Sequence, residues 1–159
     1  MLIAITGGTG FIGENLAMRC LSQGDDVRIL SRKVPCERWL SLGVEWHQGD
    51  LEDSSCLLPF VDGVDVLYHC AGQLTDAEMM QRLHVEGTRH LIEAASGRIG
   101  HWVQLSSVGV YGPVSAGEIT EESSINPVGE YEITKAESDA LVLEAASQAR
   151  FSCTILRPS

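Results

Sequence analysis

The chain has 159 residues, which is the size of one ordinary domain and short for two independent ones. Hydrophobic residues make up 44% and charged residues 21%, a balance typical of soluble globular proteins and unlike that of disordered chains. The formal net charge of -11 argues against a large phosphate-binding surface, so we expect no nucleic acid as a partner. An anionic ligand would have to be held locally, by backbone N–H groups and a few nearby cations.

The five cysteines include no C-x-x-C pair, and an odd number fits a disulfide framework poorly. We therefore expect reduced thiols and a cytoplasmic protein. The sequence shows no signal-peptide pattern and no apolar run that could span a bilayer, so no membrane is expected as a partner. The five histidines lack the spacing of metal ligands, and we expect no metal site.

In chain order, short apolar runs alternate with longer segments of helical spacing, which is typical of βα units around a parallel sheet. Six runs are predicted as buried strands: Leu2–Thr6, Asp26–Leu30, Val44–His47, Val64–His69, Trp102–Ser106 and Cys153–Leu156. Four segments are predicted as helices: Phe11–Gln23, Ser54–Phe60, Asp76–Ser96 and Tyr131–Ala149. This pattern predicts an α/β fold, a doubly wound parallel sheet of six strands with helices on both faces. The segment Gly109–Gly129, rich in Gly, Pro and Ser, is predicted to be a loop that borders a site.

A glycine-rich segment, Thr-Gly-Gly-Thr-Gly-Phe-Ile-Gly at 6–13, follows the first predicted strand and opens the first predicted helix. This context is the one that a dinucleotide-binding glycine motif requires. Gly7 would permit the tight turn, Gly10 would let the backbone approach a pyrophosphate, and Gly13 would let the helix pack closely on the strand. The predicted cofactor contacts in this segment are Gly7, Thr9, Gly10, Phe11, Ile12 and Gly13. The alternative is a glycine-rich turn that holds no ligand.

The end of the second predicted strand bears on the choice of cofactor. NAD sites usually place Asp or Glu there to bind the ribose 2′-hydroxyl, whereas this chain has Ser31 followed by Arg32 and Lys33. A hydroxyl and a guanidinium can form charge-assisted hydrogen bonds with a 2′-phosphate, which a carboxylate would repel. The sequence therefore predicts NADP(H), with Ser31 and Arg32 as contacts. The alternative is that the two cations are ordinary surface residues and that NAD is also used.

Tyr131 and Lys135 are spaced so that both side chains lie on one helix face, one turn apart. They follow a predicted strand that ends in Ser106-Ser107 and the predicted loop. An unperturbed phenol has a pKa of about 10, so proton transfer near neutrality needs a nearby cation, which Lys135 can supply.

Taken together, these motifs resemble the extended short-chain dehydrogenase/reductases, also called the NAD-dependent epimerase/dehydratase family. The resemblance runs from residue 1 to 159. It rests on seven motifs in the family's order: Thr-Gly-Gly-Thr-Gly-Phe-Ile-Gly (6–13), Gly-Asp-Leu (49–51), His-Cys-Ala-Gly (69–72), Val-Glu-Gly-Thr (85–88), Ser-Ser-Val-Gly-Val-Tyr-Gly (106–112), Tyr-Glu-Ile-Thr-Lys (131–135) and Leu-Arg-Pro (156–158).

The resemblance implies an NAD(P)-binding Rossmann domain over residues 1–159 and a catalytic set of Ser107, Tyr131 and Lys135. In this set Tyr131 is the general acid/base, Lys135 binds the nicotinamide ribose and lowers the pKa of Tyr131, and Ser107 hydrogen-bonds the reacting oxygen. Further implied cofactor contacts are Asp50, Leu51, Ala71, Gly72 and Pro158. The implied chemistry is hydride exchange at a hydroxyl or carbonyl carbon of a small molecule, such as a sugar nucleotide.

The chain departs from the family in two places. His84 stands where the family usually has Asn, and it is either a polar support of the site or a packed helix residue. The chain ends just after the sixth predicted strand, so we expect the C-terminal substrate lobe to be absent from it. Either the chain is the cofactor half of an enzyme, or it is a non-enzymatic NADP(H)-binding or redox-sensing module. The resemblance also implies a homodimer formed through the helices at 76–96 and 131–149.

Overall fold

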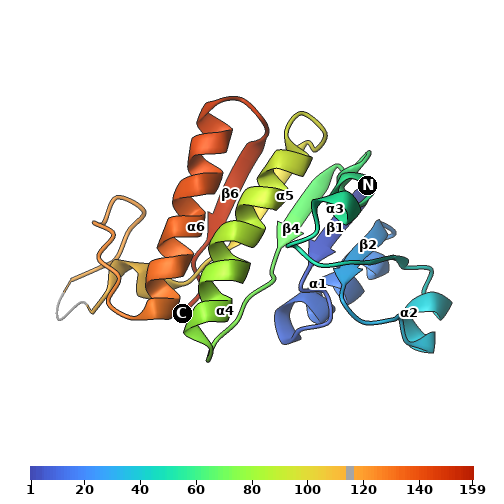
Figure 1. Ribbon diagram of the computed structural model, residues 1–159, viewed down its shortest axis with the longest axis horizontal. Coiled ribbons are helices and arrows are strands. Elements are labelled where there is room, and N and C mark those ends of the chain that lie inside the picture. The colour runs from blue at the N-terminus through green and yellow to red at the C-terminus, as the bar shows by residue number, and fades with distance from the viewer. Residues whose placement is uncertain (114–116) are drawn as a thin grey trace.

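The computed structural model describes residues 1–113 and 117–159, and its centre is one parallel sheet in the order β3-β2-β1-β4-β5-β6 (Figure 1). The strands are β1 (Leu2–Thr6), β2 (Asp26–Ser31), β3 (Glu45–Gln48), β4 (Val66–His69), β5 (His101–Leu105) and β6 (Ser152–Leu156). The chain winds outward from β1 in both directions, so the strand order reverses between β1 and β4. In such sheets ligands bind beyond the carboxyl ends of the strands at this switch point. The predicted fold class is confirmed.

Helices cover both faces of the sheet because successive side chains of each buried strand point to opposite sides. On one face, α1 (Phe11–Ser22) and α2 (Glu37–Ser41) bury Ile3, Ile5 and Ile29. On the other face, α3 (Ser54–Val61), α5 (Gly87–Ala95) and α6 (Glu130–Ser147) pack over Leu67 and Trp102. Both sides of the central strands are therefore apolar, which is why they read as unbroken apolar runs.

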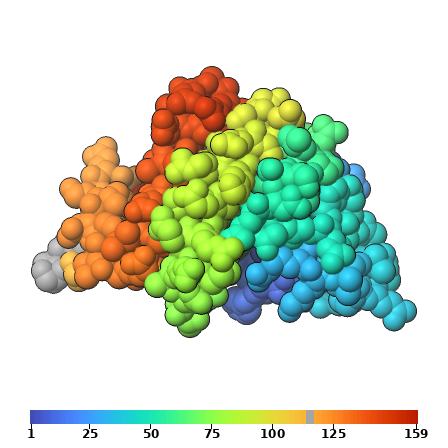
Figure 2. Space-filling view, viewed as in Figure 1, coloured from blue at the N-terminus to red at the C-terminus, as the bar shows by residue number. Residues whose placement is uncertain are grey.

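The long helix predicted at Asp76–Ser96 consists of three consecutive pieces. These are α4 (Ala77–Met80), the π-helical turn η1 (Gln81–Glu86) and α5. They run as one rod beside α6, as the ribbon and the space-filling surface both show (Figures 1 and 2). Leu91 of α5 is fully buried in the core cluster that covers this face of the sheet.

Two short elements were not predicted from the sequence. The helix α2 begins after Cys36 and buries Trp39, and the 3₁₀ turn η2 (Val108–Tyr111) overlaps the start of the predicted loop Gly109–Gly129. Residues 114–116 of that predicted loop lie outside the described residues. Within the two described ranges, every helix is too short or too polar to cross a membrane.

A fully buried imidazole joins three elements at the carboxyl end of β4. The Nδ1 atom of His69 lies 2.6 Å from Thr6 Oγ1 of β1, and its Nε2 atom lies 3.0 Å from Thr88 Oγ1 of α5. The ring also packs edge-on against Trp102, with ring centroids 5.6 Å apart. Burial, and then the charges of Lys135 and His84, lower the pKa of His69 to about 3. The folded protein therefore holds this ring neutral.

We predict that His69 makes the stability of the protein depend on pH. The unfolded chain takes up a proton at His69 near pH 6.5, whereas the folded chain does so only near pH 3. The contribution of the neutral ring is thus fully present above pH 6.5 and is lost as the pH falls toward 3, by about 1.4 kcal/mol per pH unit. Urea unfolding between pH 6.5 and 5 should give a shallower slope for His69→Gln than for the native chain, by about that amount. Equal slopes would contradict a neutral buried ring.

Candidate functional site

The glycine-rich turn between β1 and α1 passes very close to the backbone that leaves β4. Gly7 has a φ of +68°, and a Cβ atom there would lie 2.7 Å from the Ala71 nitrogen and the Cys70 carbonyl. A Cβ atom on Gly13 would overlap the carbonyl oxygen of Gly7, so the helix could not pack against the turn. Gly7 is therefore required both by contact and by its left-handed backbone, and Gly13 is required by contact alone.

The N-terminus of α1 is open to an anion. Its N-cap, Gly10, supplies no side-chain cap, and within the described residues the amides of Phe11, Ile12 and Gly13 have no hydrogen-bond acceptor. The Gly10 amide itself is bound to the Gly7 carbonyl at 2.9 Å. Free first-turn N–H groups at the start of a helix of 12 residues favour an anion, both by geometry and by the helix dipole.

A cavity of about 270 Å³ lies beside this turn, at the switch point of the sheet. Predicted cofactor residues that line it are Gly7, Thr9, Gly10, Ser31, Arg32, Asp50, Leu51, Ala71 and Gly72. The lining residues that were not predicted as contacts are Thr6, Leu30, Lys33, Gly49, Cys70 and Leu83. All of these except Leu83 adjoin predicted contacts in the sequence. Leu83 comes from η1, and its position depends on tertiary packing.

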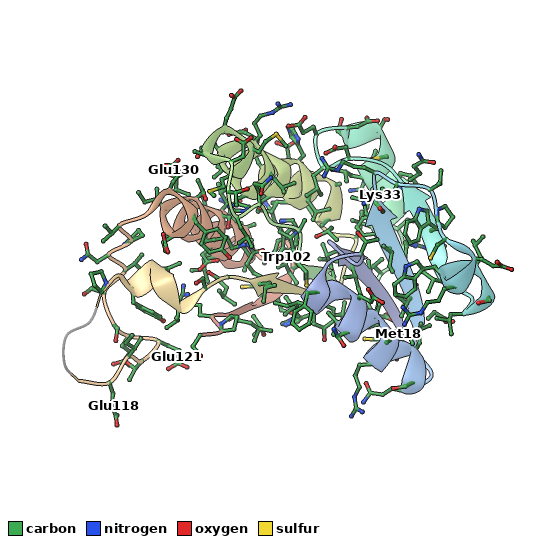
Figure 3. All side chains as sticks on the ribbon, turned by 90° about the horizontal axis from the view of Figure 1, so that it is seen from below. Met18, Lys33, Trp102, Glu118, Glu121 and Glu130 are labelled. Carbon is green, nitrogen blue, oxygen red and sulfur yellow. The ribbon has the colours of Figure 1, made fainter. Side chains whose placement is uncertain are left out.

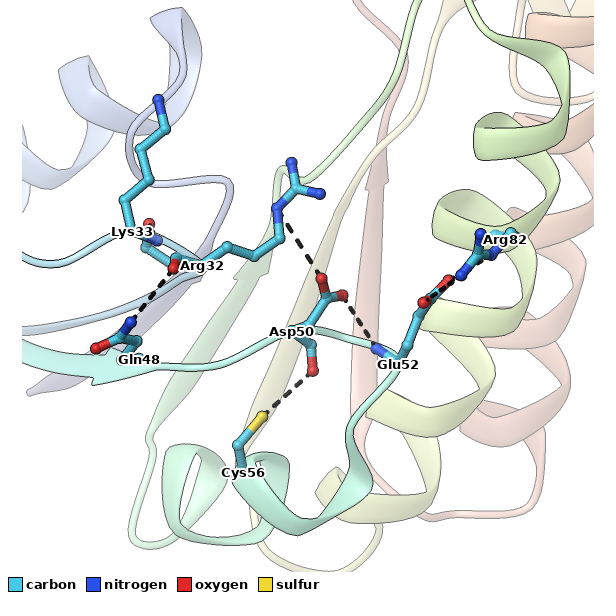
Figure 4. Close-up of polar contacts among 8 residues, drawn as sticks. Arg32, Lys33, Gln48, Asp50, Glu52, Cys56 and Arg82 are labelled. Carbon is cyan, nitrogen blue, oxygen red and sulfur yellow. Dashed lines mark hydrogen bonds and ion pairs between the residues drawn. The ribbon is translucent and has the colours of Figure 1, made fainter.

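Polar residues from the segments that follow β2 and β3 meet at one mouth of the cavity (Figure 4), together with Ser31 at the end of β2. The Arg32 side chain is 70% exposed, and its Nε atom lies 4.0 Å from Asp50 Oδ2. The other Asp50 oxygen accepts a hydrogen bond from the Glu52 amide at 3.2 Å. Ser31 Oγ accepts from the Lys33 amide at 3.2 Å, which leaves its own hydrogen free to donate. This mouth therefore presents an exposed guanidinium and a hydroxyl.

An exposed bidentate ion pair connects the segment after β3 to η1 (Figure 4). Arg82 Nε and Nη2 lie 2.7 and 2.6 Å from the two carboxylate oxygens of Glu52. A bidentate pair of this kind fixes orientation better than a single contact does. It holds the backbone near Asp50 and Leu51 against the helix that also carries Leu83.

Tyr131 and Lys135 lie in the first turns of α6, on the other side of the molecule from Lys33. Figure 3 views the molecule from below and shows Glu130, the residue before Tyr131, on the side opposite Lys33. Lys135 is 3% exposed, and burial lowers its pKa to about 8, although Asp139 and Cys70 oppose the shift. Burial raises the pKa of Tyr131, and Glu132 and Asp139 raise it further. The resemblance implies that Lys135 lowers this pKa, but the chain's own contacts act in the opposite direction.

The two serines at the end of β5 have different surroundings. Ser106 is buried, and its hydroxyl donates to Asp139 Oδ2 at 2.7 Å. Ser107 is half-buried, and its oxygen accepts from the Gly109 amide at 3.1 Å. The hydroxyl hydrogen of Ser107 is therefore free to donate to another group, whereas that of Ser106 is occupied. This difference supports the choice of Ser107 over Ser106 made from the sequence.

A buried polar cluster braces α6 against the ends of β5 and β6. Asp139 Oδ2 accepts from Ser106 and from Arg157, whose Nη2 atom lies 3.1 Å away. Arg157 Nη1 also donates to the Tyr111 hydroxyl at 2.7 Å. The next residue, Pro158, accepts from the Val108 amide at 3.0 Å, which places it beside η2 and outside the cavity lining. The cluster fixes the strand ends between which Ser107 lies.

The sequence left open whether His84 is a polar support of the site or a packed helix residue. In the structure His84 is both packed and hydrogen-bonded. It is 1% exposed, and its Nε2 atom accepts from the Gln73 amide at 2.9 Å. Its Nδ1 atom lies 2.8 Å from Thr134 Oγ1 in α6. The ring stands edge-on to Tyr131, with centroids 5.6 Å apart and planes at 83°. Burial, with the charge of Lys135, lowers the pKa of His84 to about 4.

Comparison with solved structures agrees with this architecture. A short-chain dehydrogenase/reductase superfamily protein from Agrobacterium tumefaciens with bound NAD matches 99% of the chain with a TM-score of 0.88 and 28% identity. The dTDP-glucose 4,6-dehydratase DesIV from Streptomyces venezuelae, with NAD and TYD bound, matches 99% with a TM-score of 0.85 and 27% identity. This chain covers 48% of the first structure and 55% of the second.

Sequence comparison gives the same assignment. The dTDP-6-deoxy-L-talose 4-dehydrogenase (NAD(P)(+)) of Kitasatospora kifunensis is 33% identical over 98% of this chain, which covers 51% of that protein. The chain thus spans about half the length of the curated relatives that it matches. The family model described as "NAD dependent epimerase/dehydratase family" matches residues 3–159. The chain therefore belongs to the NAD-dependent epimerase/dehydratase family of the short-chain dehydrogenase/reductase superfamily.

Proposed function

We propose that this chain binds NADP(H) and forms the cofactor-binding part of an oxidoreductase, epimerase or dehydratase. The observation that carries the proposal is the cavity at the switch point, which joins the glycine turn to Ser31 and Arg32. The residues present fit a dinucleotide. The crowding at Gly7 and Gly13 leaves room for backbone but for no side chain, and the first-turn amides of α1 are free to bind a pyrophosphate. We expect this to take place in the cytoplasm, where the five free cysteines would stay reduced.

The proposed preference for NADP(H) rests on the positive charge at the mouth of the cavity. Arg32 and Lys33 both line it, and the Arg32 guanidinium is largely exposed. Its ion pair with Asp50 is long and solvated, so it is weak and can be exchanged for a phosphate. In a chain with a net charge of -11, such a local cation pair favours an extra phosphate group at this place.

We predict that the chain binds NADPH more tightly than NADH. Arg32→Ala should weaken NADPH binding about 10- to 100-fold, as expected for the loss of a charge-assisted hydrogen bond, and change NADH binding by about twofold or less. Isothermal titration calorimetry with each nucleotide measures both effects. Arg19→Ala, at the exposed far end of α1, is the matched control and should change neither. Tighter binding of NADH, or equal weakening of both nucleotides by Arg32→Ala, would contradict the 2′-phosphate assignment.

For catalysis we propose that Tyr131 exchanges a proton with the reacting oxygen of the substrate. When bound, the nicotinamide gives or takes the hydride. In the reducing direction the acid must begin protonated, and the raised pKa of Tyr131 favours the phenol. Its hydrogen passes to the carbonyl oxygen, and Ser107 donates a second hydrogen bond to that oxygen. In this proposal Lys135, whose buried ammonium has a pKa of about 8, binds the nicotinamide ribose and stabilises the phenolate that remains.

Removing the Tyr131 hydroxyl should greatly slow turnover and leave cofactor binding in place. We expect Tyr131→Phe to lower the rate of hydride transfer by 100-fold or more, because general acid catalysis contributes about 10²–10⁴. Nucleotide absorbance during incubation with a panel of sugar nucleotides and their keto derivatives measures the rate, and calorimetry measures binding. Equal rates for the two proteins would remove Tyr131 from the mechanism. Binding without any turnover in the native chain would favour a cofactor-binding or redox-sensing module.

The proposed substrate class is a sugar nucleotide or a related small molecule with a hydroxyl or carbonyl carbon. The support comes from the names of similar proteins, a dTDP-6-deoxy-L-talose 4-dehydrogenase and a dTDP-glucose 4,6-dehydratase. The chain spans about half of such relatives, so the activity of the whole protein stays a proposal.

We also propose a homodimer formed through α5 and α6. The two helices run side by side, and a groove of about 230 Å³ between them mixes cations such as Arg89 with carboxylates such as Glu93 and Glu144. A twofold axis over such a groove can pair each charge with its opposite on the second copy. Sedimentation velocity should show a species of twice 17.2 kDa, and the fraction of protein in this species should rise with protein concentration. A monomer at every concentration would exclude the dimer.

A further inference from the structure

The hydrogen bonds of His84 assign the position of its proton. The Gln73 backbone amide can only donate, so the Nε2 atom that faces it at 2.9 Å must carry a lone pair. The proton of the neutral ring is therefore on Nδ1, from which it is donated to Thr134 Oγ1 at 2.8 Å. The Thr134 hydroxyl in turn lies 3.0 Å from the carbonyl oxygens of Glu130 and Tyr131 and donates to them.

In this series of hydrogen bonds each group donates to the next, and the series joins two parts of the site. It begins at Gln73, which directly follows the cavity residue Gly72, and it ends in the first turn of α6 at Tyr131. The Nε2 atom of His84 also lies just behind Gly72, at 3.5 Å from where a Cβ atom would stand. The imidazole is thus the contact between the backbone under the cofactor cavity and the turn that carries the phenol.

We propose that His84 is a positioning residue, a neutral imidazole protonated at Nδ1 that fixes the spacing between the Gly72–Gln73 backbone and Tyr131. This proposal rests on the proposed function, because the spacing matters for a cofactor that must reach from the cavity to the phenol. The edge-on packing of His84 against Tyr131 restrains the phenol ring from the same side. Protonation of Nε2 would set an N–H group against the Gln73 N–H group, so the bridge depends on the neutral ring.

The surroundings of His84 keep the ring neutral. Lys135 and Tyr131 approach it from α6, and His69 approaches it from β4. The charge of Lys135 and burial both disfavour an imidazolium, and the pKa of about 4 follows from them. The bridge should therefore be intact above about pH 5 and be lost as the pH falls through 4.

The test compares two substitutions at this position in the native chain. His84→Gln keeps an acceptor oxygen that can reach the Gln73 amide, whereas His84→Leu fills similar volume without any acceptor. If His84 positions the site, the Gln variant should bind NADPH within about threefold of the native chain, and the Leu variant at least tenfold more weakly. If His84 is only a packing residue, the Leu variant should bind and resist urea as well as the native chain does, which would overturn the proposal.

A second measurement does not depend on cofactor binding. NMR of ¹⁵N-labelled histidine should show His84 as the Nδ1–H tautomer down to about pH 5, and ¹³C-tyrosine spectra should show that the pKa of Tyr131 changes in His84→Leu but much less in His84→Gln. An Nε2–H tautomer, or a Tyr131 pKa that neither substitution changes, would overturn the positioning role. If the native chain binds neither NADPH nor NADH, the proposed function fails, and these spectra still decide whether the bridge exists.

Discussion

The site depends on how closely the chain leaving β1 passes the chain leaving β4. At Gly7 the two backbones are so near that a single Cβ atom would touch both the Cys70 carbonyl and the Ala71 nitrogen. This contact aligns the free N–H groups at the start of α1 with the switch point of the sheet, where the cavity lies. A side chain at Gly7 would separate the two strand ends and move the uncapped start of α1 away from the residues that border the cavity.

Behind the cavity, burial controls which groups carry charge. Lys135, His69 and His84 interact with one another, and burial lowers the pKa of each. The two imidazoles are held neutral near pH 7, so Lys135 is the cation of this layer. Because the whole chain has a net charge of -11, the attraction for an anionic ligand must come from a few placed groups: the helix end, Arg32, Lys33 and Lys135.

The fold and the cavity could be predicted from the sequence because their signals are local. Apolar runs mark the strands, and the glycines follow β1 directly, so the residues that line the cavity, apart from Leu83, lie at the ends of predicted strands or shortly after them. The features that escaped prediction depend on contacts distant in sequence. The role of His84 requires Gln73 and Thr134, which lie 11 and 50 residues away. The spacing of Tyr131 and Lys135 can be read from the sequence, and it led to the expectation that Lys135 lowers the pKa of Tyr131. Burial and the charge of Asp139, which raise this pKa, cannot be read from the sequence.

The π-helical turn η1 has a geometric consequence for the rod formed by α4, η1 and α5. A π-helical turn takes up one residue more than an α-helical turn, so it shifts the phase of every side chain that follows it. The face of α5 that packs on the sheet, with Leu91 at its centre, is therefore set apart from the face on which Met80 is buried. Within η1 itself, Leu83 turns to the cavity and His84 to α6, which places neighbouring residues on two different partners. Shortening this turn by one residue would restore a regular helix, but it would rotate Leu83 away from the cavity or His84 away from α6.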